Sequence, residues 1–280
     1  MTTLPPAAIL AALRSGTPIP TEESRVPWIE RLGCGTPAYR LTVPASAPCR
    51  TLLFFHAGGF TSCSTADHLD LCARLADAAG AGIVSVDYRL APEHPFPAAV
   101  EDALSVYRYL LEGGCLPAQL VPVGISAGGT LVLSMLLAGR SLGLPMPAAA
   151  VLLSPVVDLL FQGESMIFNQ ETDWLTPDRL EAMRDDYLAG HDPSDPLASP
   201  LYADLEGLPP LFVQAGGGEV LIDGIRAFVE TARLEGVPVT FDCVDGMFHF
   251  WQAFAGVLPE AAEAIERAGA FVQRCVPEEE

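Results

Sequence analysis

The stretch Gly124-Ile125-Ser126-Ala127-Gly128-Gly129 joins an apolar run, Leu120 to Val123, to a longer one, Thr130 to Leu137. The first run is typical of a buried strand and the second of a helix. A serine between them lies on a sharp strand-to-helix turn, where side chains in place of the nearby glycines would crowd the backbone. The stretch therefore predicts a nucleophile elbow that holds the Ser126 hydroxyl above a sheet.

A serine hydroxyl is a weak nucleophile at neutral pH, so it needs an imidazole to take its proton and a carboxylate to orient that imidazole. On such an elbow the acid and then the histidine follow the serine along the chain. Of the five histidines, this order leaves His191 and His249. His249 follows the strand-like run Val239 to Val244, whereas His191 lies in a polar stretch broken by prolines. We expect His249 to be the base and His191 to be a surface residue.

The orienting acid is expected on a loop after an earlier strand. The run Leu211 to Ala215 is followed by three glycines and then Glu219, which is our first choice. Asp223 lies one helical turn further on the same face and is the rival acid, and Asp245 is a more distant one. The alternative for Glu219 is a solvated carboxylate in the first turn of a helix, where the helix dipole favours it.

The tetrahedral oxyanion of such a reaction needs preorganised backbone donors. Gly58 and Gly59 follow the strand-like run Thr51 to Phe55, and glycines at the end of a buried strand let a ligand approach the backbone closely. We therefore expect the oxyanion hole to consist of the amides of Gly58, Gly59 and Ala127. His56, which precedes these glycines, is expected to make a structural hydrogen bond rather than to act as the base.

With these segments in place, the chain resembles the hormone-sensitive-lipase-like esterases, the bacterial family IV of α/β-hydrolases, over nearly its whole length. The resemblance rests on five segments: His56 to Phe60, Asp87 to Ala99, Gly124 to Gly129, Ser154 to Leu159 and Ser199 to Leu201. The acid motif of that family falls on Glu219 to Asp223, with the acid position on Glu219. The resemblance implies an α/β-hydrolase fold and ester hydrolysis through an acyl-enzyme on Ser126.

Four residues depart from the family pattern. Ala57 replaces the first glycine of the oxyanion loop, and Ile125 replaces the aspartate before the nucleophile, a carboxylate that can hydrogen-bond nearby loops. Phe250 replaces the glycine after the histidine, and Glu219 is one methylene longer than the usual aspartate. We expect catalysis to tolerate Ala57, because the donors are the next two amides, and we expect the Phe250 ring to narrow the acyl pocket.

The 280 residues suffice for one large α/β domain, a mostly parallel, doubly wound sheet with a small helical cap. Strands are expected at Ala38 to Val43, Thr51 to Phe55, Gly82 to Val86, Leu120 to Gly124, Ala149 to Leu153, Leu211 to Ala215 and Val239 to Val244. Helices are expected near Asp67 to Ala79, Ala98 to Glu112, Ser126 to Leu142, Asp223 to Glu235 and Pro259 to Val272.

Two segments lie outside this alternation. Residues 161–198 interrupt the pattern and contain a helical Thr176 to Arg184, and residues 1–35 contain a helical Ala7 to Leu13. Long insertions between sheet elements are usually functional. The resemblance implies that these two segments form a cap over the serine, and that residues 36–160 and 199–280 form the hydrolase core. The alternative is that the two segments are only helices on the periphery of the fold. We expect four side chains to line the substrate pocket: Phe60, Phe168, Trp174 and Phe250.

Composition excludes several other function classes. The net charge of −20 disfavours nucleic acids and anionic membranes as partners. Metal-ligand spacings and phosphate-cradling glycine motifs are missing, so neither a metal nor another cofactor is expected. The N-terminus lacks a basic region before its apolar residues, and the seven cysteines contain no C-x-x-C pair. We expect a cytoplasmic protein with reduced thiols; a homodimer stays open.

These features favour a serine carboxylesterase that acts on small esters with short acyl chains, since an alkoxide leaves more readily than an amine. Hydrolysis of lactones, amides or thioesters by the same residues is an alternative. A non-catalytic small-molecule binder on the same fold is another, because some plant receptors resemble this family but lack its histidine. The presence of both Ser126 and His249 argues against the binder.

Overall fold

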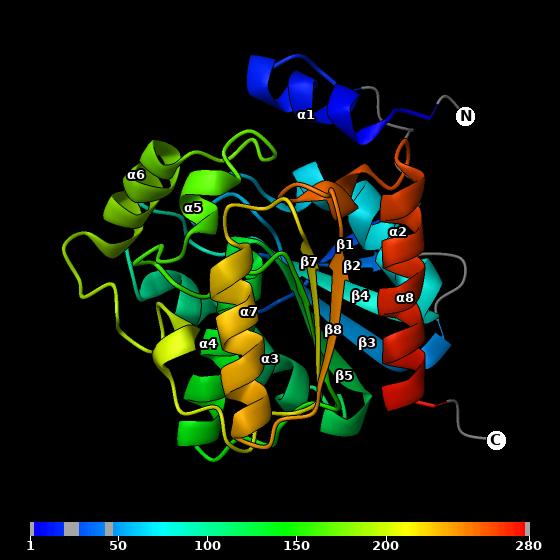
Figure 1. The fold of residues 1–280 in the computed structure, drawn as a ribbon. Coiled ribbons are helices and arrows are strands. Elements are labelled where there is room, and N and C mark those ends of the chain that lie inside the picture. Colours follow the sequence, from blue (N-terminus) through cyan, green and yellow to red (C-terminus); the bar gives the residue numbers. More distant parts are fainter. Residues whose placement is uncertain (1–2, 20–27, 43–46, 278–280) are drawn as a thin grey trace.

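One eight-stranded sheet runs through the molecule in the order β1-β2-β4-β3-β5-β6-β7-β8 (Figure 1). The computed structural model describes residues 3–19, 28–42 and 47–277. The strands are β1 (Trp28–Arg31), β2 (Ala38–Thr42), β3 (Ala47–Phe55), β4 (Ala81–Val86), β5 (Leu120–Ile125), β6 (Ala150–Leu153), β7 (Leu211–Gly216) and β8 (Val239–Val244). β1 and β2 pair antiparallel, as do β2 and β4, and the other neighbours are parallel. The predicted mostly parallel sheet is confirmed.

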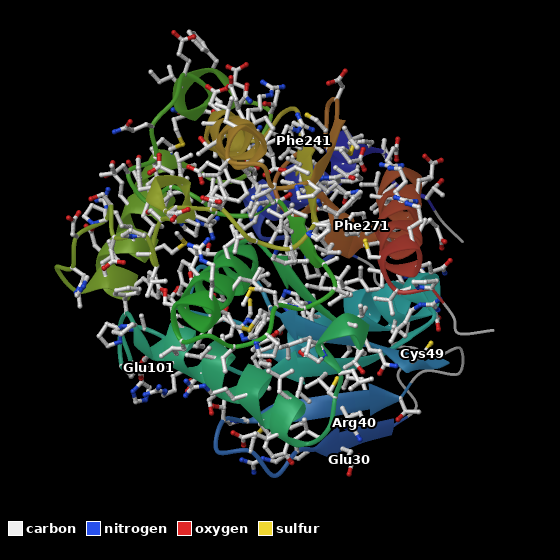
Figure 2. The ribbon with its side chains drawn as sticks, turned by 90° about the horizontal axis from the view of Figure 1, so that it is seen from below. Glu30, Arg40, Cys49, Glu101, Phe241 and Phe271 are labelled. Atoms are coloured by element: carbon white, nitrogen blue, oxygen red, sulfur yellow. The ribbon has the colours of Figure 1, made fainter. Side chains whose placement is uncertain are left out.

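β1 is the strand that the sequence pattern missed. It lies at the edge of the sheet, its Ile29 side chain is 48% exposed, and it offers no buried apolar run to detect. Glu30 of β1 and Arg40 of β2 are register partners, and Figure 2 shows them on adjacent strands at this edge. The attraction between opposite charges on neighbouring strands stabilises the pairing of β1 with β2 modestly.

Side chains that alternate along each strand pack into two separate hydrophobic cores, one on each face of the sheet. Leu53 and Phe55 of β3 pack in the core under α3 (Ala98–Glu112), α4 (Ala127–Ser141) and α7 (Ile222–Leu234). Leu52 and Phe54 pack in the core under α2 (Leu69–Ala79) and α8 (Pro259–Cys275). Figure 1 shows the two groups of helices on opposite faces of the sheet, so the doubly wound prediction holds. In Figure 2, Phe241 of β8 and Phe271 of α8 belong to these two different cores.

The helices lie within a few residues of the predicted ranges, except for the short α5, which the sequence pattern did not predict. They are α1 (Pro6–Ser15), α2 (Leu69–Ala79), α3 (Ala98–Glu112), α4 (Ala127–Ser141), α5 (Ser165–Phe168), α6 (Pro177–Leu188), α7 (Ile222–Leu234) and α8 (Pro259–Cys275), with short 3₁₀ turns at Thr65–His68, Pro117–Gln119, Pro200–Tyr202 and Trp251–Phe254. None of them, in the part of the chain that the structure describes, is long and apolar enough to cross a membrane. Val43, the predicted end of one strand, lies outside the described residues.

The insertion after β6 contacts the N-terminal helix. The guanidinium of Arg14, in the last turn of α1, donates hydrogen bonds of 2.8 Å to the carbonyl oxygens of Gln170 and Asp173. Figure 1 shows α1, α5 and α6 on the same side of the molecule, above the sheet. Two segments far apart in the sequence are thereby joined.

Gly128 permits the close approach of α4 to the end of β3. A Cβ atom there would lie 2.0 Å from the Phe55 carbonyl oxygen and 2.7 Å from that of His56, both of which are backbone atoms. We expect Gly128→Ala to lower the free energy of unfolding by about 2 kcal/mol or more, because the backbone must shift. The measurement is urea unfolding followed by circular dichroism.

Gly139 in the same helix provides the matched control. A Cβ there meets side-chain atoms at an ordinary 3.8 Å, and alanine is favoured over glycine in a helix by about 1 kcal/mol. Gly139→Ala should therefore leave the stability unchanged or raise it. Equal stability of the two variants would contradict the proposed role of Gly128.

Candidate active site

Ser126 occupies the turn between β5 and α4 in a conformation that side chains rarely adopt. Its φ is 57° and its ψ is −122°, and its amide donates to the Leu153 carbonyl at 2.9 Å. Gly124 makes the turn feasible, because a Cβ at that position would lie 2.1 Å from the Gly128 carbonyl oxygen. A backbone of this kind costs about 1 to 3 kcal/mol and persists only where its surroundings enforce it. The predicted strand, sharp turn and helix are all present.

His249 bridges Ser126 and Glu219. Its Nε2 atom lies 2.8 Å from Ser126 Oγ, and its Nδ1 atom lies 2.9 Å from Glu219 Oε2. An ionised carboxylate can only accept, so Nδ1 carries the proton and Nε2 is free to accept from the serine hydroxyl. The three residues follow β5, β7 and β8, whose parallel carboxyl ends meet at one edge of the sheet.

Glu219 is fully buried and held by two donors. Its Oε1 atom accepts hydrogen bonds from the Gly216 amide at 2.5 Å and from Ser154 Oγ at 2.7 Å. These contacts leave Oε2 for the imidazole. The alternative of a solvated carboxylate does not fit a side chain with no exposed area. Ser154, which sequence reasoning left without a role, belongs to a segment that carries the family resemblance.

The rival acids lie elsewhere. Asp223 is partly exposed, accepts from the amide of Ser165 at the start of α5 at 2.8 Å and lies 4.0 Å from Arg226. It therefore anchors the insertion rather than the imidazole. Asp245 is exposed in the turn after β8. His191, as expected, is a half-exposed side chain, and it lies 3.7 Å from Asp195.

Two opposing influences act on the protonation of His249. Burial disfavours the imidazolium, but the hydrogen bond to Glu219 and the negative charges of Glu219 and Asp173 favour it. The hydrogen bond and the two negative charges together outweigh burial, so the pKa of His249 is raised above its ordinary value. The free base is needed to accept a proton, so the active fraction should increase as the pH rises through this elevated pKa.

The loop after β3 brings two glycine amides to the same cavity as Ser126. Gly58 and Gly59 have φ angles of 118° and 61°, and a Cβ on Gly58 would overlap the backbone carbonyl group of Ser62. Glycine is therefore required here both by conformation and by space. Ala127 is the first residue of α4, so its amide has no acceptor within the helix.

His56 lies under this loop instead of in the cavity. Its Nδ1 atom is 2.6 Å from the Ala57 carbonyl oxygen, and its ring stacks on Tyr88 at a centroid distance of 4.1 Å. Burial lowers the pKa of His56 to about 4, so the ring is neutral at pH 7. His68, which the sequence did not single out, accepts from the Ala57 amide at 3.3 Å. Both histidines support the loop.

The cavity beside Ser126 has a volume of about 350 Å³. Its lining comes from the oxyanion loop, the insertion and the two catalytic loops: Ala57, Gly58, Gly59, Thr61, Ser62, Cys63, Ser126, Val156, Trp174, Leu175, Arg179, Leu180, Met183, His249 and Phe250. Leu180 and Met183 show that α6 covers the serine. Trp174 and Phe250 were expected here; the α6 residues were not.

Two expected pocket residues do not line this cavity. Phe60 is fully buried and stacks on Tyr187 of α6 at a centroid distance of 3.7 Å, so its ring supports α6. Phe168 ends the short helix α5 and is 72% exposed. Both residues were expected in the pocket because they are aromatic, but tertiary packing decides whether each ring faces the cavity.

Phe250 stands where the family pattern described above has glycine. Its φ of 70° lies in the left-handed region, which explains why glycine suits this site. The ring packs edge-on against His68 and Phe254, at centroid distances of 5.7 Å and 6.0 Å. These contacts hold a bulky side chain at the wall of the cavity.

Titratable side chains of the described residues form no group of three or more that could hold a metal ion. The chemistry that this arrangement can perform is that of an activated serine: an imidazole to accept its proton, a buried carboxylate to orient the imidazole, and two glycines of the loop after β3 that line the same cavity.

Comparisons with known proteins agree with this geometry. The alpha/beta hydrolase fold family matches residues 52–253. An acetyl-hydrolase of Streptomyces hygroscopicus is 47% identical over 237 residues, covering 84% of this chain and 79% of the relative. An esterase of Acinetobacter venetianus is 37% identical over 232 residues, covering 82% and 77%.

Solved structures are similar over nearly the whole chain. An esterase whose crystals were soaked with p-nitrophenyl butyrate shares 36% identity, with a TM-score of 0.89 over 99% of this chain and 93% of that one. A hormone-sensitive lipase from a metagenome library shares 33% identity, with a TM-score of 0.91 over 98% and 100%. The chain therefore belongs to the α/β-hydrolase family, in its hormone-sensitive-lipase-like branch of esterases.

Proposed function

We propose that this protein hydrolyses small carboxylic esters with short acyl chains through an acyl-enzyme intermediate. The observation that carries the proposal is the continuous chain of hydrogen bonds from Glu219 through His249 to Ser126 Oγ. A non-catalytic binder on this fold has no need for such a chain. The esterase and acetyl-hydrolase names of the relatives support the same reaction class.

The reaction divides into two similar halves. Ser126 Oγ attacks the acyl carbonyl while its proton passes to His249 Nε2, and the oxyanion is stabilised by the amides of Gly58, Gly59 and Ala127. The tetrahedral intermediate expels the alkoxide, which takes the proton from Nε2. Water then gives a proton to Nε2 as it attacks the acyl-enzyme carbonyl. The second tetrahedral intermediate expels Ser126 Oγ, which takes that proton back from Nε2, so the carboxylic acid and the free serine are released.

The size of the cavity supports short acyl groups. Its volume of about 350 Å³ is at the lower end of the range for small-molecule sites. Apolar side chains from α6, from Trp174 and from Phe250 dominate its walls and exclude water, which strengthens the electrostatic stabilisation inside. This lining suits an uncharged acyl chain.

We also propose a cytoplasmic location, supported by seven cysteines that are all free thiols in the structure. The homodimer stays a prediction that sedimentation would test.

Ser126→Ala removes the nucleophile and should reduce kcat on p-nitrophenyl butyrate by at least about 10⁴-fold, because the remaining residues cannot form an acyl-enzyme. Stopped-flow and steady-state release of p-nitrophenolate measure the loss. A fluorophosphonate probe should label the wild-type protein and leave Ser126→Ala unlabelled. Wild-type turnover in the variant would end the proposal.

Glu219→Gln and Asp223→Asn separate the acid from its rival. We expect Glu219→Gln to reduce kcat by about 10²- to 10⁴-fold, since a neutral amide no longer stabilises the imidazolium or selects its tautomer. Asp223→Asn should keep kcat within about threefold, because Asp223 holds α5. The pH dependence of kcat/KM should show the acid limb of Glu219→Gln moved to lower pH, as the carboxylate that raises the pKa of His249 is gone. The reverse ranking of the two losses would make Asp223 the acid.

Phe250→Ala tests the wall of the acyl pocket. Removing the ring should raise kcat/KM for p-nitrophenyl octanoate relative to the butyrate by about tenfold, which corresponds to burying part of the longer chain in the new space. Phe168→Ala is the control, because that ring faces solvent and should leave the ratio unchanged. An unaltered ratio in Phe250→Ala would show that another side chain limits the acyl length.

A further inference from the structure

A carboxylate that the reaction itself does not use lies buried beside the active site. Asp173, in the insertion between α5 and α6, is 1% exposed. Its Oδ1 atom accepts from the amides of His249 at 3.0 Å and Trp174 at 2.8 Å, and its Oδ2 atom accepts from the amide of Val220 at 2.9 Å. Both oxygens are thus occupied by backbone donors.

Trp174 completes the contact with the catalytic base. Its indole Nε1–H donates to the carbonyl oxygen of His249 at 2.8 Å. Two consecutive residues of the insertion therefore bind both polar main-chain groups of His249. The same carboxylate also holds Val220, the residue that follows Glu219, so the loops of the base and the acid are attached to one side chain.

The N-terminal helix supports this arrangement from outside. Arg14 Nε and Nη2 donate to the Asp173 carbonyl oxygen at 3.2 Å and 2.8 Å, and Nη2 also binds the Gln170 carbonyl oxygen. The main chain of Asp173 is thereby fixed by α1, while its side chain fixes the catalytic loops. A continuous set of contacts joins α1 to the imidazole.

Asp173 acts on the imidazole of His249 through its negative charge as well as through its hydrogen bonds. The titratable groups that influence His249 are Glu219, on the loop after β7, and Asp173, on the insertion. Burial raises the pKa of Asp173 itself, and the nearby imidazole counters this effect. Backbone amides directed at both oxygens favour the ionised form.

We propose that Asp173, together with Trp174, is a positioning residue pair that ties the insertion to the catalytic histidine and sets both the placement and the basicity of its imidazole. This inference rests on the proposed function and deepens it. The insertion then has two tasks: it covers the cavity, and it holds the base at the distance that proton transfer requires. A misplacement of about 1 Å can cost about 10²-fold in rate.

Asp173→Asn is the principal test, because the amide keeps the size of the carboxylate but has only one acceptor oxygen in place of the two that receive three backbone donors. We expect kcat on p-nitrophenyl butyrate to fall by about 10- to 100-fold, with KM changed by less than about threefold. The acid limb of kcat/KM should move to lower pH, because a negative charge that favours the imidazolium has been removed.

Two further variants refine the test. Glu171→Gln removes an equal charge two positions away on the exposed surface of the insertion and should leave kcat, KM and the acid limb unchanged. Trp174→Phe keeps an aromatic wall but loses the Nε1–H donor, and it should lower kcat with little effect on the acid limb. Thermal unfolding of each variant reports whether the fold is retained.

A readout that does not require turnover separates this inference from the proposed function. In a Ser126→Ala background, the His249 imidazole is titrated by NMR, and its signal is identified by its loss in His249→Gln. Addition of Asp173→Asn should lower the pKa of His249. If the wild-type protein hydrolyses no ester, the proposed function fails while this titration still tests Asp173. An unchanged pKa together with wild-type kcat, or a loss confined to thermal stability, would overturn the positioning role.

Discussion

The close approach of backbone segments around Ser126 is the constraint on which the rest of the site depends. The serine keeps its unusual φ and ψ because Gly124 has no Cβ to meet the backbone of Gly128, and Gly128 has none to meet the end of β3. This geometry directs Oγ toward the His249 ring and places the start of α4 beside the oxyanion loop. The strain is compatible with a stable fold because β5, which leads into the serine, is fully buried and hydrogen-bonded to β3 on one side and β6 on the other.

Burial of charge is the second organising feature. Glu219 and Asp173 are both inaccessible to solvent, and each is compensated by backbone amides as well as by the imidazole. A buried carboxylate without such donors would lose its charge or destabilise the fold. Because the donors belong to β7, the β8 loop and the insertion, the electrostatics of the base depend on elements that are distant in sequence.

Several parts of the fold followed from local patterns. Strand β5 and helix α3 appear where their apolar periodicities indicate, since a buried strand needs a continuous apolar run and an amphipathic helix a 3.6-residue repeat. β1 escaped detection because an edge strand needs neither. For the site, the order of elements along the chain selected Ser126 and His249, whose hydrogen bond the structure contains.

By itself, the amino-acid sequence determined the strand, turn and helix around Ser126 and the order in which acid and base follow it, because these depend on local sterics and apolar patterning. Only the tertiary structure decided that Glu219 rather than Asp223 reaches the imidazole, that Phe168 faces solvent, and that Asp173 binds the backbone of His249. Such contacts join residues far apart along the chain, and their distances are set by how the insertion packs on the sheet, which no local pattern encodes.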